Sequence, residues 1–121
     1  MSAPLLERWF ATMDSAHPEE VLEFISDDFH ISVVFSGGPG GPMSDFSGDR
    51  AALVAYLGQR LRDVRTHTVL SAVRTGRDEL LLGEVSQLGE FEASFVAAAR
   101  LTDDGKVSRL LIGRSPGTQF S

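Results

Sequence analysis

The spacing of apolar residues predicts a helix at the start of the chain. From Leu5 to Met13 the apolar side chains recur every three or four positions, which is typical of an amphipathic helix over about 4–14. Pro4 suits the first turn of such a helix, and Ser2 is the expected N-cap. This helix is expected to turn its apolar stripe toward the core.

A second helix and a strand are expected to follow. His17 and Pro18 precede two acidic residues, a pattern that favours the first turn of a helix reaching about residue 25. Residues 29–35 then alternate, with Ile31, Val33 and Phe35 on one face, which predicts a strand. Residues 36–42 contain four glycines and two prolines and form the clearest loop, either a connecting turn or a flap over a pocket.

The rest of the chain predicts one more helix and a series of strands. The helix is expected over about 50–63, and the strands over 67–73, 79–87, 90–101 and 107–114. Helices followed by an antiparallel meander define an α+β class, with three N-terminal helices packed on a curved, mainly antiparallel sheet around an interior pocket. We expect a single domain over 1–121, with a flexible tail from about residue 115. Val96 and Ala98 are expected to face a second copy of the chain, which predicts a homodimer.

Composition narrows the function classes. The net charge of −6 argues against nucleic-acid binding, which needs basic side chains to replace counterions. No apolar run approaches the roughly 20 residues of a membrane helix, and no signal sequence is visible, so a cytoplasmic protein is expected. The chain has no cysteine, and its three histidines lack metal-ligand spacing, so no metal site is expected. The glycine loop is not followed by a phosphate-binding Gly-Lys-Ser, so no nucleotide cofactor is expected either.

Several short segments resemble the nuclear transport factor 2 superfamily, with its ketosteroid isomerase-like and SnoaL-like branches. The resemblance extends from Leu5 to about Arg114 and combines the order of elements with four segments: Arg8-Trp9-Phe10-Ala11, Phe24-Ile25-Ser26-Asp27-Asp28-Phe29, Phe46-Ser47-Gly48-Asp49-Arg50-Ala51-Ala52-Leu53 and Leu101-Thr102-Asp103-Asp104-Gly105-Lys106-Val107. It implies a cone-shaped domain with a blind apolar cavity. It also implies a small hydrophobic ligand and no cofactor.

The same resemblance implies that the known catalytic acids are replaced. Trp9 falls where steroid isomerases keep a tyrosine, Val33 at their base and Ala97 at their second acid. Ile112 falls at the aspartate that epoxide hydrolases and polyketide cyclases of this fold keep on the last strand. Valine, alanine and isoleucine can neither move a proton nor bind an oxyanion. The mechanisms of these relatives therefore do not transfer to this chain.

Strand alternation suggests a different set of polar groups for the pocket. Side chains two positions apart on a strand share a face, so Glu84 faces inward if Leu82 does. His67 likewise shares a face with Val69, and Arg114 with Ile112. Glu84 is then the expected base, His67 the proton relay and Arg114 the anion-stabilising group, while Trp9 orients the ligand. The expected ligand-binding residues are Trp9, Val33, Tyr56, Leu82, Phe95, Ala97 and Ile112.

Two functions remain open on this reading. The first is a cofactor-independent isomerase, cyclase or dehydratase that acts on a polyketide- or terpenoid-like substrate by acid–base chemistry. The second is a non-catalytic small-molecule-binding or dimerisation module of the same fold. An unpaired Glu84 that faces one cavity with His67 and Arg114 favours the first. A salt bridge between Glu84 and Arg114, with the cavity filled by Phe91, Phe95 and Trp9, weakens both and leaves a structural scaffold.

Overall fold

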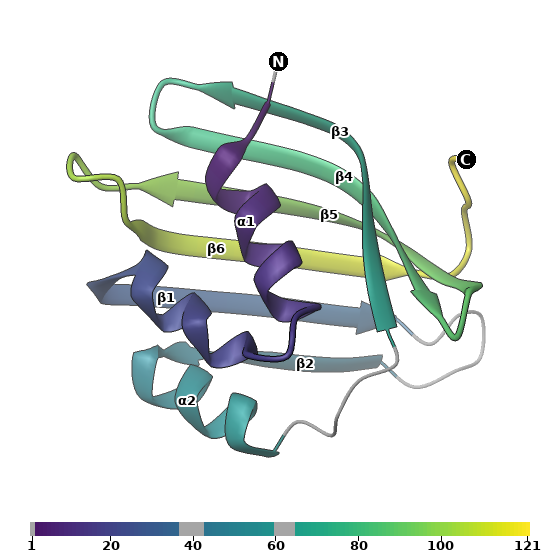
Figure 1. Ribbon diagram of the computed structural model, residues 1–121, viewed down its shortest axis with the longest axis horizontal. Helices are drawn as coiled ribbons and strands as arrows, with labels where there is room; N and C mark the ends of the chain where they lie inside the picture. Colours follow the sequence, from purple (N-terminus) through teal and green to yellow (C-terminus); the bar gives the residue numbers. More distant parts are fainter. Residues whose placement is uncertain (1, 37–42, 60–64) are drawn as a thin grey trace.

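The computed structural model describes residues 2–36, 43–59 and 65–121. Within these ranges, three helical segments lie on one side of a six-stranded mixed sheet, which confirms the α+β class (Figure 1). The elements in chain order are α1 Pro4–Met13, the 3₁₀ helix η1 Pro18–Phe24, β1 Ile25–Ser36, β2 Met43–Asp49, α2 Arg50–Gln59, β3 Arg65–Thr75, β4 Asp78–Gln87, β5 Glu90–Leu101 and β6 Val107–Ser115. No helix in the described ranges is long and apolar enough to cross a membrane.

The sheet joins the predicted meander to a second unit of two strands. Its order is β2-β1-β6-β5-β4-β3, and every neighbouring pair is antiparallel except β1 and β6, which run parallel. Phe29, Ile31 and Val33 are buried on the inner face of β1, as their alternation predicts. The expected end of the third helix and the glycine loop fall on residues 60–64 and 37–42, outside the described residues.

The strand β2 was not predicted from the sequence. The sequence suggested no strand between the glycine loop and the next helix, but residues 43–49 pair with β1 in a regular antiparallel register, with Phe46 opposite Val33. Only Met43 and Phe46 are apolar in this segment, so its alternation is too weak to identify a strand. The hydrogen bonds with the longer strand β1 hold this segment extended, although its own sequence has little strand character.

A bend in the sheet creates its concave face. In β3 the pairing register shifts between Val69 and Ser71, and Val69 lies opposite Gly83 of β4. A bulge increases the local twist, and a glycine allows the neighbouring strand to follow it. Phe95 lies directly opposite Gly83 on β5, and its ring occupies the space that a side chain there would need. Figure 1 shows β3 and β4 bending toward the helices at this end of the sheet.

We expect Gly83→Ala to lower the free energy of unfolding by about 2 kcal/mol, in the range of overpacked cores. The new Cβ would lie 2.6 Å from Cζ of Phe95 and 2.7 Å from the carbonyl oxygen of Thr68, so both strands would have to move. Gly58→Ala in α2 is the control, because a Cβ there meets nothing within 4 Å. Urea unfolding of the two variants tests the expectation. Equal stability of Gly83→Ala and the wild type would contradict it.

A buried carboxylate on β4 holds the first turn of α1. Glu79 is 0% exposed and accepts hydrogen bonds from the backbone N–H of Leu5 at 3.3 Å and of Leu6 at 2.8 Å. These are the N–H groups that an N-cap side chain normally satisfies. The N-cap residue is Ala3, so the expectation that Ser2 caps the helix is wrong. The cap instead comes from a strand more than seventy residues away in the sequence.

Candidate functional site

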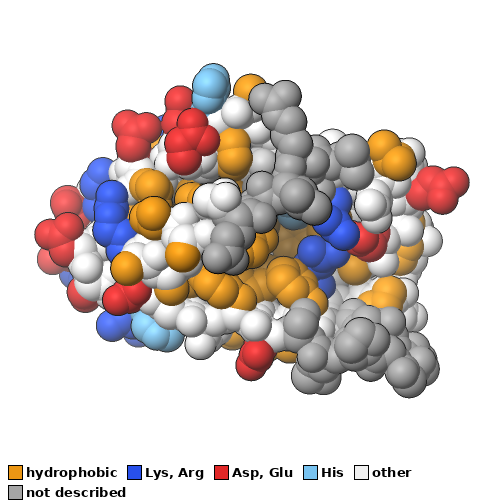
Figure 2. Space-filling model, turned by 90° about the horizontal axis from the view of Figure 1, so that it is seen from below, with side chains coloured by type: hydrophobic (Ala, Val, Ile, Leu, Met, Phe, Trp, Pro, Cys, Tyr) orange, Lys and Arg blue, Asp and Glu red, His pale blue; other side chains and the backbone are white. Residues whose placement is uncertain are grey.

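An apolar pocket of about 540 Å³ lies between the concave face of the sheet and the helices. Figure 2 shows it as a hollow with hydrophobic side chains inside and basic side chains along one edge. Of the expected ligand-binding residues, five line it: Trp9, Val33, Tyr56, Phe95 and Ile112. Further apolar walls that the sequence did not single out are Phe10, Met13, Phe35, Phe46 and Leu53.

The inward register expected for β4 is wrong by one residue. Glu79, Leu81 and Val85 are buried on the inner side, whereas Leu80 is 44% exposed. Leu82 accordingly lines a surface groove with Leu80 on the outer face rather than the pocket. The cause is the run of three leucines at 80–82, which is apolar on both faces and therefore hides the alternation. Ala97 is buried on the inner face opposite Ile112, but it does not line the pocket.

Because of this register, Glu84 lies outside the pocket. Its carboxylate accepts hydrogen bonds from the backbone N–H groups of Phe120 at 3.0 Å and Ser121 at 2.9 Å, and from the Ser121 hydroxyl at 2.7 Å. The hydroxyl bond, followed by the two backbone bonds, holds the pKa of Glu84 below its usual value. Neither expectation for Glu84 is met in these contacts, because it is neither an unpaired base facing the pocket nor the partner of Arg114. Glu84 instead binds Phe120 and Ser121, in the C-terminal segment that was expected to form a flexible tail.

His67 lines the pocket and is held in place by hydrogen bonds to Asp14. Nδ1 of His67 is 2.6 Å from Oδ1 of Asp14, and the backbone N–H of His67 donates to Oδ2 at 2.7 Å. The ring packs between Phe10 and Phe95, with centroid distances of 5.0 and 5.4 Å. A carboxylate can only accept, so the neutral imidazole carries its proton on Nδ1 and keeps a lone pair on Nε2.

The Nε2 atom of His67 is available to a ligand. Its ring hydrogen bond to Asp14 uses Nδ1 only. Within the described part of the chain, no fully buried side-chain nitrogen or oxygen lacks a hydrogen-bond partner, so an unbonded Nε2 must reach open space. His67 lines the pocket, so Nε2 is the ring nitrogen that a ligand there could reach. Asp14, the C-cap of α1, was not among the residues that the sequence suggested.

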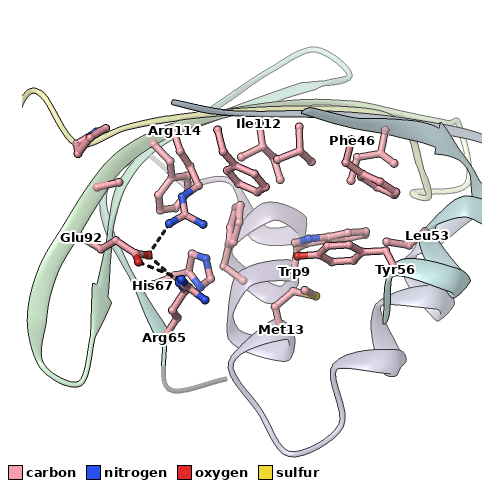
Figure 3. Close-up of a pocket in the computed structure, with 17 residues that line it drawn as sticks. Trp9, Met13, Phe46, Leu53, Tyr56, Arg65, His67, Glu92, Ile112 and Arg114 are labelled. Carbon is pink, nitrogen blue, oxygen red and sulfur yellow. Dashed lines mark hydrogen bonds and ion pairs between the residues drawn. The ribbon is translucent and has the colours of Figure 1, made fainter. Parts of the chain in front are cut away.

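Arg114 lies at the same end of the pocket as His67, beside a shared carboxylate (Figure 3). Glu92 accepts from Nε of Arg65 at 2.7 Å on Oε1 and from Nη2 of Arg65 at 3.0 Å on Oε2. Nη2 of Arg114 donates to Oε1 of the same carboxylate at 2.5 Å. The hydrogen bond from Arg65, together with the charges of both arginines, holds the pKa of Glu92 below its usual value.

Glu92 was missed because it sits at an irregularity of its strand. Ala93 pairs with Val85 and Phe91 with Ser86, so Glu92 is the extra residue of a bulge. Bulges re-aim side chains and commonly occur near functional sites. A strict two-residue alternation does not hold across a bulge, and the sequence carries no marker for it.

These groups give the pocket one polar end in an otherwise apolar wall. The end offers a hydrogen-bond acceptor at Nε2 of His67 and guanidinium donors at Arg114. The opposite end is formed by aromatic and aliphatic side chains such as Trp9, Leu53 and Tyr56 (Figure 3). Among the residues described, no three His, Asp or Glu side chains lie close enough together to hold a metal ion.

No protein-family model and no curated protein sequence matches the chain. Several solved structures match its fold. One is a protein titled an isomerase of the SnoaL-like family from Agrobacterium tumefaciens, with a TM-score of 0.68 and 11% identity over 93% of this chain and 95% of that one. Another, titled a polyketide cyclase from Sinorhizobium meliloti, has a TM-score of 0.62 and 16% identity over 91% and 94% of the two chains. A third, titled a ketosteroid isomerase from Kribbella flavida, has a TM-score of 0.65 and 16% identity over 98% and 80%.

These likenesses, which span nearly the whole chain, define the fold. It is the fold that these SnoaL-like and NTF2-like structures share, as the sequence resemblance indicates. At such low identities the match establishes the architecture and not an activity, because one fold supports many chemistries.

Proposed function

We propose that this protein is a cofactor-independent acid–base enzyme that acts on a small, mainly hydrophobic carbonyl compound. The observation that carries the proposal is that Asp14 holds His67 at the wall of an apolar pocket that also contains Arg114. A base and an anion-stabilising group in one mainly apolar site are the minimum for proton transfer next to a carbonyl. The named activities of the structural neighbours, isomerase and polyketide cyclase, belong to this class of chemistry.

In the proposed mechanism, Nε2 of His67 removes a proton from the carbon beside the carbonyl group of the ligand. The electron pair moves onto the carbonyl oxygen, and the guanidinium of Arg114 stabilises the resulting enolate. Asp14 fixes the ring and stabilises the imidazolium that forms. The imidazolium then returns the proton to another carbon in an isomerisation, or to a leaving oxygen in a dehydration. Trp9 and Tyr56 would hold the hydrophobic body of the ligand.

A non-catalytic binding module is the second candidate function. It is supported by the residues at the positions of the family's acids, since Val33 and Ile112 form plain apolar wall. The carboxylate that lines the described pocket, Glu92, is bound to two arginines and is not free to act as a base. A protein of this kind would retain its ligand unchanged.

Ligand recovery separates the two candidates. The purified protein is incubated with an extract of its source, and the retained molecule is identified by native mass spectrometry. The enzyme proposal expects the recovered molecule, or a close precursor of it, to be converted by fresh protein. A ligand that binds tightly and is never converted would favour the binding module.

We further propose that two copies of the chain associate through the outer face of the sheet. This face exposes a group of large apolar side chains, with Leu80 at 44%, Val96 at 58% and Leu111 at 54%. They belong to β4, β5 and β6, which are adjacent in the sheet. Exposed apolar patches of this kind commonly mark protein interfaces.

We expect the double variant Val96→Asp, Leu111→Asp to be monomeric, while the wild type elutes as a dimer. Both side chains are already exposed, so two charges disrupt an interface without unfolding the subunit. Light scattering coupled to gel filtration measures the mass. Leu88→Asp is the control, because Leu88 is 76% exposed in the turn between β4 and β5 and lies in the left-handed conformation that Asp tolerates. A monomeric wild type would reject the dimer.

A further inference from the structure

We infer that the ligand of the pocket carries a carboxylate and that Arg114 binds it. This rests on the proposed function and deepens it, because it names the chemical class of the molecule that would occupy the same pocket. The carboxylate and the enolate oxygen of the proposed mechanism would then share the donors of Arg114 that Glu92 does not use. The inference starts from the donors of Arg114. Its hydrogen bond to Glu92 uses Nη2, and its guanidinium lies 4.7 Å from the centre of the Phe35 ring. Within the described residues, Nε and Nη1 have no partner.

These donors face the pocket rather than the interior of the protein. The side chain of Arg114 is only 19% exposed, yet no buried nitrogen among the described residues is left without a partner. Nε and Nη1 must therefore reach open space. Figure 3 shows the guanidinium pointing into the cavity toward His67.

Glu92 does not satisfy Arg114 by itself. Both oxygens of Glu92 accept from Arg65, in the bidentate geometry that suits a guanidinium and a carboxylate. Arg114 receives only a share of Oε1, which already accepts from Nε of Arg65. A second carboxylate could thus bind Arg114 without breaking the pair between Arg65 and Glu92.

The surroundings favour a charged oxygen over a neutral one. Hydrogen bonds between ions are roughly twice as strong as neutral ones, and the difference grows where water is scarce. The guanidinium lies over the aromatic ring of Phe35, at 4.7 Å from its centre, so one of its faces is against an apolar surface. Two guanidiniums and one carboxylate line this end of the pocket, so an anionic ligand meets an excess of donors.

The remaining walls of the pocket indicate that the other end of the ligand is hydrophobic. Away from Arg114 the walls are apolar and aromatic, with Trp9, Phe46 and Leu53 among them (Figure 3). At about 540 Å³, the space suits a molecule of the size that typical ligand pockets enclose. The geometry therefore fits a hydrophobic monocarboxylate, with its body against α1 and α2 and its carboxylate on β6.

Trp9 makes the inference directly measurable. It is the only tryptophan of the chain and lines the pocket, so its fluorescence reports on occupancy. The probes are adamantane-1-carboxylate and adamantane-1-carboxamide, which share a hydrocarbon body and differ in charge. We expect the carboxylate to bind at least about tenfold more tightly than the amide, a difference typical of one charge-assisted pair.

Variants of two arginines complete the test. Arg114→Gln is expected to remove the preference for the carboxylate while leaving amide binding unchanged, and the Arg65–Glu92 pair should keep it folded. Arg109→Gln is the control, because Arg109 is 57% exposed and lines a groove on the outer face. Circular dichroism checks the fold of both variants.

Three results would overturn the inference. They are equal affinities of the wild type for both probes, a preference that survives in Arg114→Gln, and no saturable binding of either probe at millimolar concentration. The outcome is separable from that of the proposed function. Carboxylate binding that depends on Arg114, with no conversion of any carboxylate, would uphold the inference and remove the enzyme proposal. Turnover of a neutral ligand with no preference for the carboxylate would do the reverse.

Discussion

Replacing Glu79 by alanine is expected to lower the free energy of unfolding by about 3 kcal/mol, which is large for one residue in a domain of this size. The substitution removes the acceptor of the Leu5 and Leu6 N–H groups, of which the second lies in a fully buried contact. An unsatisfied buried donor costs about 1–3 kcal/mol, and loss of an N-cap typically costs about 1 kcal/mol. Loss of a negative charge at the positive end of the helix adds to both.

Glu79→Gln separates the geometry of this cap from its charge. The amide oxygen can still accept one N–H, so a loss of about half that of alanine is expected. Glu20→Ala, at an exposed position in η1, is the control and should change stability by less than about 0.5 kcal/mol. Urea denaturation followed by circular dichroism measures all three variants. A stability of Glu79→Ala within about 0.5 kcal/mol of the wild type would show that α1 does not depend on this contact.

The cap also bears on the pocket. Helix α1 supplies Trp9, Phe10 and Met13 to the wall and ends at Asp14, which holds His67. The start of α1 is fixed by Glu79, and its C-terminal end by contact with β3. The position of the base in the proposed mechanism thus depends on two carboxylates at opposite ends of one helix.

Local patterns predicted most of the elements and several pocket residues. The spacing of Leu6, Trp9 and Phe10 places one face of α1 in the core, and all three are buried. In β1, the apolar residues Phe29, Ile31 and Val33 alternate with polar ones, so the inward position of Val33 follows directly. These predictions succeed because each depends on residues that are close together in the sequence.

The predictions that failed depend on partners far apart in the sequence or on broken alternation. Glu79 and Asp14 act through contacts with residues more than fifty positions away, which no short pattern records. Glu92 lines the pocket because it lies at a bulge of β5. The apolar side chains of Leu80 and Leu82 wrongly predict that Glu84 faces the pocket, because these leucines lie on the outer face. An apolar outer face is itself what an interface between subunits would require, so the misleading pattern on β4 and the proposed dimer have the same origin.

In an assay with the ligand recovered from the pocket, His67→Gln is expected to lower kcat by about 10²–10⁴, the usual contribution of a general base. His67 is only 13% exposed, and glutamine keeps a polar side chain in its place. Glu84→Gln is the control, because Glu84 binds the C-terminal segment on the outer face and does not line the pocket. A His67→Gln variant as active as the wild type would remove His67 from the mechanism.

Asp14→Asn tests how His67 is held, because it keeps the shape of the site and reverses the direction of the hydrogen bond between residue 14 and Nδ1 of His67. Its amide oxygen can still accept the backbone N–H of His67, while its NH₂ group would donate to Nδ1. The ring proton then moves to Nε2, and the lone pair no longer faces the ligand, so kcat should fall about as far as in His67→Gln. Ligand affinity and the unfolding midpoint should change little, because no contact is lost. A purely structural role for Asp14 predicts the opposite, a lowered midpoint with kcat preserved in the fraction that remains folded. The split between kcat and stability therefore decides whether Asp14 orients a base or only ties α1 to β3.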